Sequence, residues 1–140
     1  MAGSKIIDNG QWIIDNGGDM GDGAVQSKSF AFAVRVVNLH RLLSSEKKEF
    51  ILSKQVLRSG TAIGALVREA EQAESKADFV HKMAIALKEA NETEYWLLLL
   101  HKTEYLEASA FDSIHGDIVE LLKLLTSIVR NGKLTMDNGQ

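Results

Sequence analysis

The chain has 140 residues, of which 45% are hydrophobic and 25% charged, and its formal net charge is −3 at pH 7. That length favours a single domain with a sizeable core. The absence of cysteine excludes a disulfide scaffold, a thiolate metal site and a cysteine nucleophile, and the absence of proline favours long uninterrupted helices.

The acidic charge is concentrated at the two ends of the chain. Residues 1–26 contain one Lys and four Asp, whereas residues 27–134 contain 15 basic and 14 acidic residues. A dedicated nucleic-acid binder usually shows a clear basic excess, which the central segment lacks.

Neither end of the sequence carries a membrane or secretion signal. No apolar run approaches the ~20 residues of a membrane span. The N-terminus lacks the basic and then apolar pattern of a signal peptide. We therefore expect a cytoplasmic protein with no membrane partner.

The first 26 residues are rich in Gly and Asp and contain a short repeat. The string IIDNG occurs at residues 6–10 and again at 13–17, and DNGQ occurs at 8–11 and at 137–140. Asn9-Gly10 between two apolar pairs is compatible with a β-hairpin. Two strands alone are marginally stable, so we favour a low-complexity, flexible tail over residues 1–26.

The first helix is predicted over Ser29–Leu43, where apolar residues recur three and four apart. Ser44 and Ser45 could then cap a second helix over Lys47–Glu74. Small residues surround Gly60 and Gly64 in that helix, and they predict close packing against a neighbour.

The third helix is the longest unbroken stretch, Ser75–Tyr105, with Ser75 as the N-cap. A fourth is predicted over Phe111–Arg130, with Ser109 as its N-cap and Asn131-Gly132 as its stop. Short connections between these helices predict an all-α, antiparallel up-and-down four-helix bundle over residues 27–132, followed by a C-terminal tail over 133–140.

Acids and histidines in a four-helix bundle raise the question of a dimetal site. Asp-x-x-His occurs at Asp78/His81 and at Asp112/His115, in the first turns of antiparallel helices. The two motifs therefore lie near opposite ends of the bundle, and we predict no metal site.

Catalytic patterns are also missing from the sequence. Ser59, Thr61 and Ser75 have no His and acid at a recognisable spacing, and neither G-x-S-x-G nor a phosphate-binding loop occurs. We expect no catalytic residues, no cofactor, no small-molecule substrate and no enzymatic activity.

Several basic residues lie on the second and third helices. Lys54 and Arg58 are four residues apart and share a face. They could contact phosphates, which requires only positive charge on one surface. They could equally pair with acids, the interpretation we favour, and the candidate partners are Glu69, Glu89 and Glu92.

Three segments taken together resemble a known family. They are KSFAFAVRVVNLHRLL from Lys28, LSKQVLRSGTAIGA from Leu52 and the run EAEQAESKADFVHKMAIALKEANETEYWLLLL from Glu69. With the terminal helix, they are similar to the family of the 23S ribosomal RNA intervening-sequence protein, also called S23, over residues 28–132.

The resemblance implies a bacterial four-helix bundle without known enzymatic activity. The family is similar to the accessory variability protein of diversity-generating retroelements, which implies a homopentamer working with a reverse transcriptase and nucleic acid. The chain departs from the family at Leu66, where Asn is common, and in its nearly neutral charge.

Two hypotheses about function follow. The first is a non-enzymatic, self-assembling scaffold or adaptor with Tyr95 and Trp96 at the oligomer interface, because adjacent residues cannot both face one core line. The alternative is a nucleic-acid-binding accessory protein that uses four basic residues: Lys54, Arg58, Arg68 and Lys88.

Overall fold

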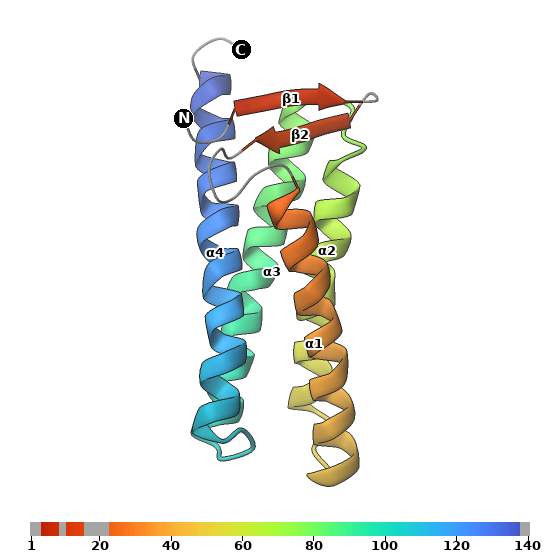
Figure 1. Ribbon diagram of the computed structural model, residues 1–140, viewed down its shortest axis with the longest axis vertical. Helices are drawn as coiled ribbons and strands as arrows, with labels where there is room; N and C mark the ends of the chain where they lie inside the picture. The colour runs from red at the N-terminus through yellow and green to blue at the C-terminus, as the bar shows by residue number, and fades with distance from the viewer. Residues whose placement is uncertain (1–3, 9–10, 16–22, 138–140) are drawn as a thin grey trace.

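The computed structural model describes residues 4–8, 11–15 and 23–137. Four helices, α1 (Ala24–Glu46), α2 (Leu52–Ala70), α3 (Lys76–Lys102) and α4 (Ala108–Asp137), run up and down in turn (Figure 1). α2 packs against α1 and α3, and α4 packs mainly against α3. The predicted antiparallel four-helix bundle is confirmed. None of these described helices is long and apolar enough to cross a membrane.

Two short strands precede the bundle, β1 (Ser4–Asp8) and β2 (Gln11–Asp15). They pair in antiparallel fashion, with Ile6 opposite Ile13. Figure 1 shows the hairpin at the end of the bundle where α2 ends and α3 begins. The structure therefore contains the hairpin that the sequence analysis ranked second. The turn predicted at Asn9-Gly10 lies outside the described residues, and the division of the chain at residue 26 stays a prediction.

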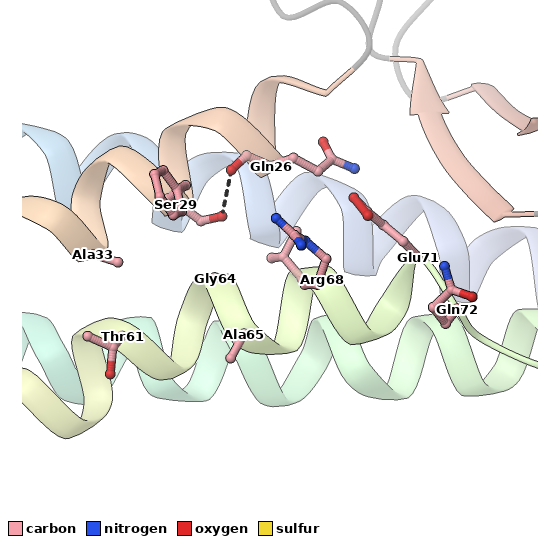
Figure 2. Close-up of a pocket in the computed structure, with 11 residues that line it drawn as sticks. Gln26, Ser29, Ala33, Thr61, Gly64, Ala65, Arg68, Glu71 and Gln72 are labelled. Carbon is pink, nitrogen blue, oxygen red and sulfur yellow. Dashed lines mark hydrogen bonds between the residues drawn. The ribbon is translucent and has the colours of Figure 1, made fainter.

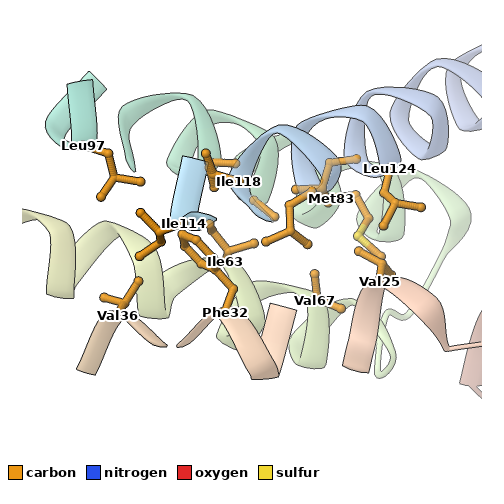
Figure 3. Packing of buried hydrophobic residues seen from close by; sticks show 14 of the residues in the cluster. Val25, Phe32, Val36, Ile63, Val67, Met83, Leu97, Ile114, Ile118 and Leu124 are labelled. Carbon is orange, nitrogen blue, oxygen red and sulfur yellow. The ribbon is translucent and has the colours of Figure 1, made fainter. Parts of the chain in front are cut away.

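Apolar side chains from all four helices meet in one continuous core (Figure 3). They lie three or four residues apart on each helix, as the sequence pattern predicts. The largest fully buried side chains are those of Phe32, Leu43, Ile63, Phe79, Met83, Leu97, Leu100, Ile118, Leu121, Leu124, Leu125 and Ile128.

The predicted close packing at Gly60 and Gly64 is confirmed, and the neighbour is α1. A Cβ atom added to Gly60 would lie 2.8 Å from Val36 Cγ2, and one added to Gly64 would lie 3.3 Å from the Ser29 carbonyl oxygen. Any side chain at Gly60 would overlap a fully buried valine. Glycine at this position therefore sets the distance between α1 and α2.

One residue earlier, α2 makes a polar contact with α3. Ser59 and Thr93 are both fully buried, and their hydroxyl oxygens lie 2.8 Å apart. Ser59 Oγ also lies 3.0 Å from the Gln55 carbonyl oxygen, within reach to donate to it. Thr93 can then donate to Ser59, so that neither buried hydroxyl is left without a partner.

The start of α2 differs from the prediction. Ser44 and Ser45 belong to α1, where their hydroxyls donate to the carbonyls of His40 and Arg41, so they do not cap α2. The cap is instead the buried carboxylate of Glu49, which accepts hydrogen bonds from three backbone N–H groups, those of Ile51, Leu52 and Ser53, at 2.7–3.2 Å. A carboxylate suits the positive end of the helix dipole.

The predicted start of α3 is confirmed, whereas the predicted start and end of α4 are wrong. Ser75 caps α3 as expected, with its Oγ accepting from the Asp78 N–H at 3.0 Å. α4 begins at Ala108, so Ser109 lies inside the helix instead of capping it. The predicted stop at Asn131-Gly132 is also wrong: Gly132 is buried and α4 continues to Asp137. Packing against the bundle thus outweighs the low helix propensity of glycine.

Gly60 and Gly116 form a matched pair for testing the close approach of α1 and α2. Replacing Gly60 with Ala should destabilise the fold by roughly 1–2 kcal/mol, because overlap with Val36 outweighs the gain in helix propensity. Gly116→Ala on exposed α4, where nothing lies within 4 Å of the added Cβ, should stabilise by about 0.5–1 kcal/mol. Urea unfolding followed by circular dichroism measures both changes. A Gly60→Ala protein as stable as the Gly116→Ala protein would contradict the close approach of α1 and α2 at Gly60.

Candidate functional site

The part of the chain that the structure describes holds no group of three or more His, Asp or Glu side chains able to bind a metal ion. His115, one of the two histidines in the Asp-x-x-His motifs, instead pairs with Glu94 of α3, with His115 Nε2 2.8 Å from Glu94 Oε2. The ring of His115 also stacks on Phe111, with centroids 4.8 Å apart, and Phe111 stacks on His101 at 4.3 Å. These rings pack α3 against the start of α4.

One Ser-His-Glu cluster superficially resembles a catalytic triad. His40 Nδ1 lies 3.1 Å from Ser53 Oγ, and the Glu49 carboxylate accepts from the Ser53 N–H. Ser53 is fully buried, however, and its hydroxyl donates to the Glu49 carbonyl oxygen at 2.8 Å. The Glu49 carboxylate binds backbone N–H groups and not the imidazole. His40 Nδ1 is therefore the donor to Ser53, and the cluster holds the α1–α2 loop in place.

Arg58 on α2 reaches across to two carboxylates of α3. Its guanidinium contacts Glu92 and lies 3.3 Å from Glu89 Oε1. Glu92 also accepts a hydrogen bond from Trp96 Nε1 at 3.0 Å. The favoured interpretation, pairing with acids, is confirmed for Arg58 and is wrong for Lys54, which has no ion pair among the described residues. With two carboxylates beside one guanidinium, this cluster is not a positive surface.

The contacts around Glu92 shift the pKa of its carboxyl group. The hydrogen bond from Trp96 and then the hydrogen bond and charge of Arg58 lower the pKa of Glu92, against an opposing effect of burial. The same hydrogen bond to Glu92 raises the pKa of Arg58. Both groups therefore stay charged around neutral pH.

The other three predicted basic residues are exposed. Lys54 and Arg68 lie on the outer face of α2, and Lys88 lies on the outer face of α3. None of them has an ion-pair partner among the described residues, in contrast to Arg58 and to Lys82, which binds Glu69 at 3.1 Å. The structure therefore does not bring the four predicted basic residues together as one patch.

A groove of about 620 Å³ runs between α1 and α2 on the outside of the bundle. Small residues make its floor, including Ala33, Gly64 and Ala65, and Phe30 forms one wall with 65% of its surface exposed. Figure 2 shows Arg68 between Gln26 and Glu71 at the polar end of the groove. Sequence reasoning missed this groove, although the small residues on α2 predicted the close approach that forms it.

The two residues predicted at an oligomer interface have different surroundings. Tyr95 is 58% exposed on the outer face of α3, and Leu98 on the same face is 46% exposed. Trp96 packs partly against the core and points its indole N–H at Glu92. The two rings touch edge to face, with centroids 5.0 Å apart. Whether they form an interface stays a prediction.

A test of the Arg58–Glu92–Trp96 cluster is the pH dependence of stability. Because the pKa of Glu92 is lowered on folding, its contribution is complete well above the ordinary glutamate value of about 4.3 and is lost as the pH falls below it. Replacing Glu92 with Gln should lower the free energy of unfolding at pH 7 by up to about 1 kcal/mol, since the pair is half-exposed. The difference from wild type should vanish near pH 3, as measured by urea unfolding.

The matched control is Glu74→Gln, whose carboxylate has no ion pair among the described residues. It should leave stability unchanged across this pH range. A Glu92→Gln effect of equal size at pH 7 and pH 3 would contradict an electrostatic contribution.

Comparison with known proteins places the chain in a family. The family model for the 23S rRNA-intervening sequence protein matches residues 22–127. A crystal structure of a protein with unknown function from the S23 ribosomal protein family of Bacteroides thetaiotaomicron VPI-5482 is 61% identical, with a TM-score of 0.74. The match covers 75% of this chain and 97% of that chain. A search of curated proteins found no significant match.

Neither of these descriptions names a catalytic activity. The matched region contains the whole of α1, α2 and α3 and most of α4, and it leaves out the N-terminal hairpin. The chain therefore belongs to the 23S rRNA-intervening sequence protein family.

Proposed function

We propose that the protein is a non-enzymatic scaffold or adaptor that assembles from several copies of itself in the cytoplasm. The observation that supports this most directly is the distribution of large apolar side chains on its surface. Phe30 and Val34 are 65% and 47% exposed on α1, and Tyr95 and Leu98 are 58% and 46% exposed on α3. Exposed apolar side chains grouped along a helix are typical of interaction sites.

The outer face of α4 provides the contrast. Its exposed positions from Asp112 to Arg130 are polar, charged or glycine. In a bundle that remained a monomer, exposed apolar residues on α1 and α3 would add no stability. The polar face of α4 shows the surface expected where no contact is made. The two apolar faces lie on different sides of one chain, so they suit a head-to-tail contact between copies.

Such a contact closes into a ring when the rotation between copies allows it. The resemblance to the accessory variability protein makes a homopentamer the leading assembly. In this proposal Tyr95 and Leu98 supply one half of the contact, and Trp96 supports Tyr95 from behind through their edge-to-face packing.

Nucleic-acid binding is the second candidate function. Lys54, Arg68 and Lys88 support it, because they are exposed and free of ion pairs within the described part of the chain. The name of the family, which refers to an insertion in ribosomal RNA, points the same way. Arg58 supports it less, since two carboxylates already neutralise its charge.

Size-exclusion chromatography with light scattering tests the assembly, with absorbance read at 260 and 280 nm. We expect a mass near five times the 15.4 kDa of the chain. Tyr95→Ser combined with Leu98→Ser should reduce that mass below five chains, because it removes the apolar contact. Co-purified nucleic acid in the wild-type peak would favour the second candidate.

A matched control keeps the result specific to α3. Asp112→Ser combined with Lys123→Ser changes two exposed residues of α4 without changing the net charge, and it should leave the mass unchanged. A wild-type protein that elutes as a monomer at micromolar concentration would refute the self-assembling scaffold.

A further inference from the structure

The loop between α1 and α2 carries a third exposed apolar surface, which is unlike the other two because it is positively charged. We call it the α1–α2 corner and define it by Arg41, Lys48, Phe50, Ile51 and Lys54. Phe50 is 55% exposed and Ile51 is 75% exposed. Beside Phe50 lies an open hollow of about 630 Å³, which Arg41 and Lys48 also line.

The backbone of this corner is held firmly. Glu49 is buried and its carboxylate accepts from the first N–H groups of α2, while its own N–H donates to the Leu43 carbonyl at 3.0 Å. Lys48 is held at φ 54°, a left-handed conformation that is uncommon for residues other than glycine. The fixed loop keeps Phe50 and Ile51 at the surface, where they gain no burial within one chain.

The charges of the corner also lack partners within the described chain. Arg41, Lys48 and Lys54 form no ion pair among the described residues, whereas Lys28, Arg35, Arg58 and Lys82 all do. The Glu49 carboxylate is occupied by backbone N–H groups, which leaves Glu46 as the exposed acid of the loop. The corner therefore suits a partner that is both acidic and apolar.

The chain itself contains a segment of that chemistry. Residues 1–22 carry four Asp against one Lys, together with Ile6, Ile7, Trp12, Ile13 and Ile14. The family match begins only at residue 22. The segment thus lies outside the family match except for its last residue.

We propose that the N-terminal segment of one copy, residues 1–22, docks on the α1–α2 corner of a second copy. The aspartates would face Arg41, Lys48 and Lys54, and the isoleucines and Trp12 would cover Phe50 and Ile51. The contact joins two copies because the hairpin and the corner lie at opposite ends of the bundle in Figure 1. It is separate from the α3 contact proposed above and does not depend on it.

A nucleic acid would satisfy the cations of the corner but fits its apolar part less well. A base can stack on Phe50, but Ile51 is the more exposed side chain and offers no flat ring. The acidic segment matches both parts, and it is present at the same concentration as the corner.

The first experiment measures binding of a fluorescently labelled peptide of residues 1–22 by anisotropy. The receptor is the full chain in which Asp8, Asp15, Asp19 and Asp22 are changed to Asn, so that its own segment does not compete. We expect saturable binding that weakens about tenfold between roughly 50 and 500 mM NaCl, because salt screens exposed charges. Lys48→Glu combined with Lys54→Glu in the receptor should weaken it at least as much.

The matched control is Lys123→Glu combined with Arg130→Glu, which makes the same change of charge on the outer face of α4. It should leave peptide binding unchanged. Equal weakening by both pairs, or no binding of the peptide at all, would overturn the proposal. We also expect that an excess of a single-stranded RNA oligonucleotide displaces none of the bound peptide. Displacement of the peptide by the RNA would assign the corner to nucleic acid instead.

The second experiment places the contact between copies. Lys48→Glu combined with Lys54→Glu, added to the Tyr95→Ser and Leu98→Ser chain so that the α3 contact does not hold the copies together, should lower the mass measured by light scattering at low salt. Mixing this variant with a second variant, which carries Asp8→Lys and Asp15→Lys on the same α3 background, should restore the mass because the charges of the two partners are exchanged. An unchanged mass would show that the corner does not join two copies and would overturn the proposal. Loss of assembly in the α3 variant alone would bear only on the proposed scaffold and not on the corner contact.

Discussion

The close packing of α2 against both of its neighbours at Ser59 and Gly60 is the constraint on which the rest of the structure depends. Gly60 allows α1 to approach until Val36 fills the place of a side chain, and Ser59 ties α2 to Thr93 of α3 within the core. Two adjacent residues thus fix the positions of three helices. The groove outside α1 and α2 and the Arg58 cluster on the α2–α3 side both follow from this spacing.

The fourth helix is attached in a different way. α4 packs on α3 through apolar residues and the stacked rings of His101 and Phe111. It reaches α1 through half-exposed ion pairs, of Arg35 with Asp117 at 2.6 Å and of Lys28 with Glu120 at 3.1 Å. Surface pairs of this kind contribute little stability. The seam between α1 and α4 is therefore the weaker side of the bundle.

The surface separates into three kinds of face, and each suggests a different role. The outer faces of α1 and α3 are apolar in part, the α1–α2 corner is apolar and basic, and the outer face of α4 from Asp112 to Arg130 is polar. The basic residues are separated in the same way, because some bind acids within the bundle and others have no acidic neighbour. This separation, more than the net charge, indicates which surfaces are available to partners.

The amino-acid sequence by itself determined the helix count, the core stripes, the Ser75 cap and the close approach at Gly60, because these depend on local spacing and side-chain size. Tertiary structure decided the rest. α4 continues through Gly132 because packing outweighs local propensity, and Glu49 caps α2 in place of Ser44 and Ser45 because the loop folds back on the helix. Only the packing of α3 beside α2 shows that two carboxylates neutralise the charge of Arg58. The same packing leaves Lys54 and Arg68 without an ion pair among the described residues. Arg58 and its acidic partners are about thirty positions apart in the sequence, and only the packing of the helices decides which charged residues meet.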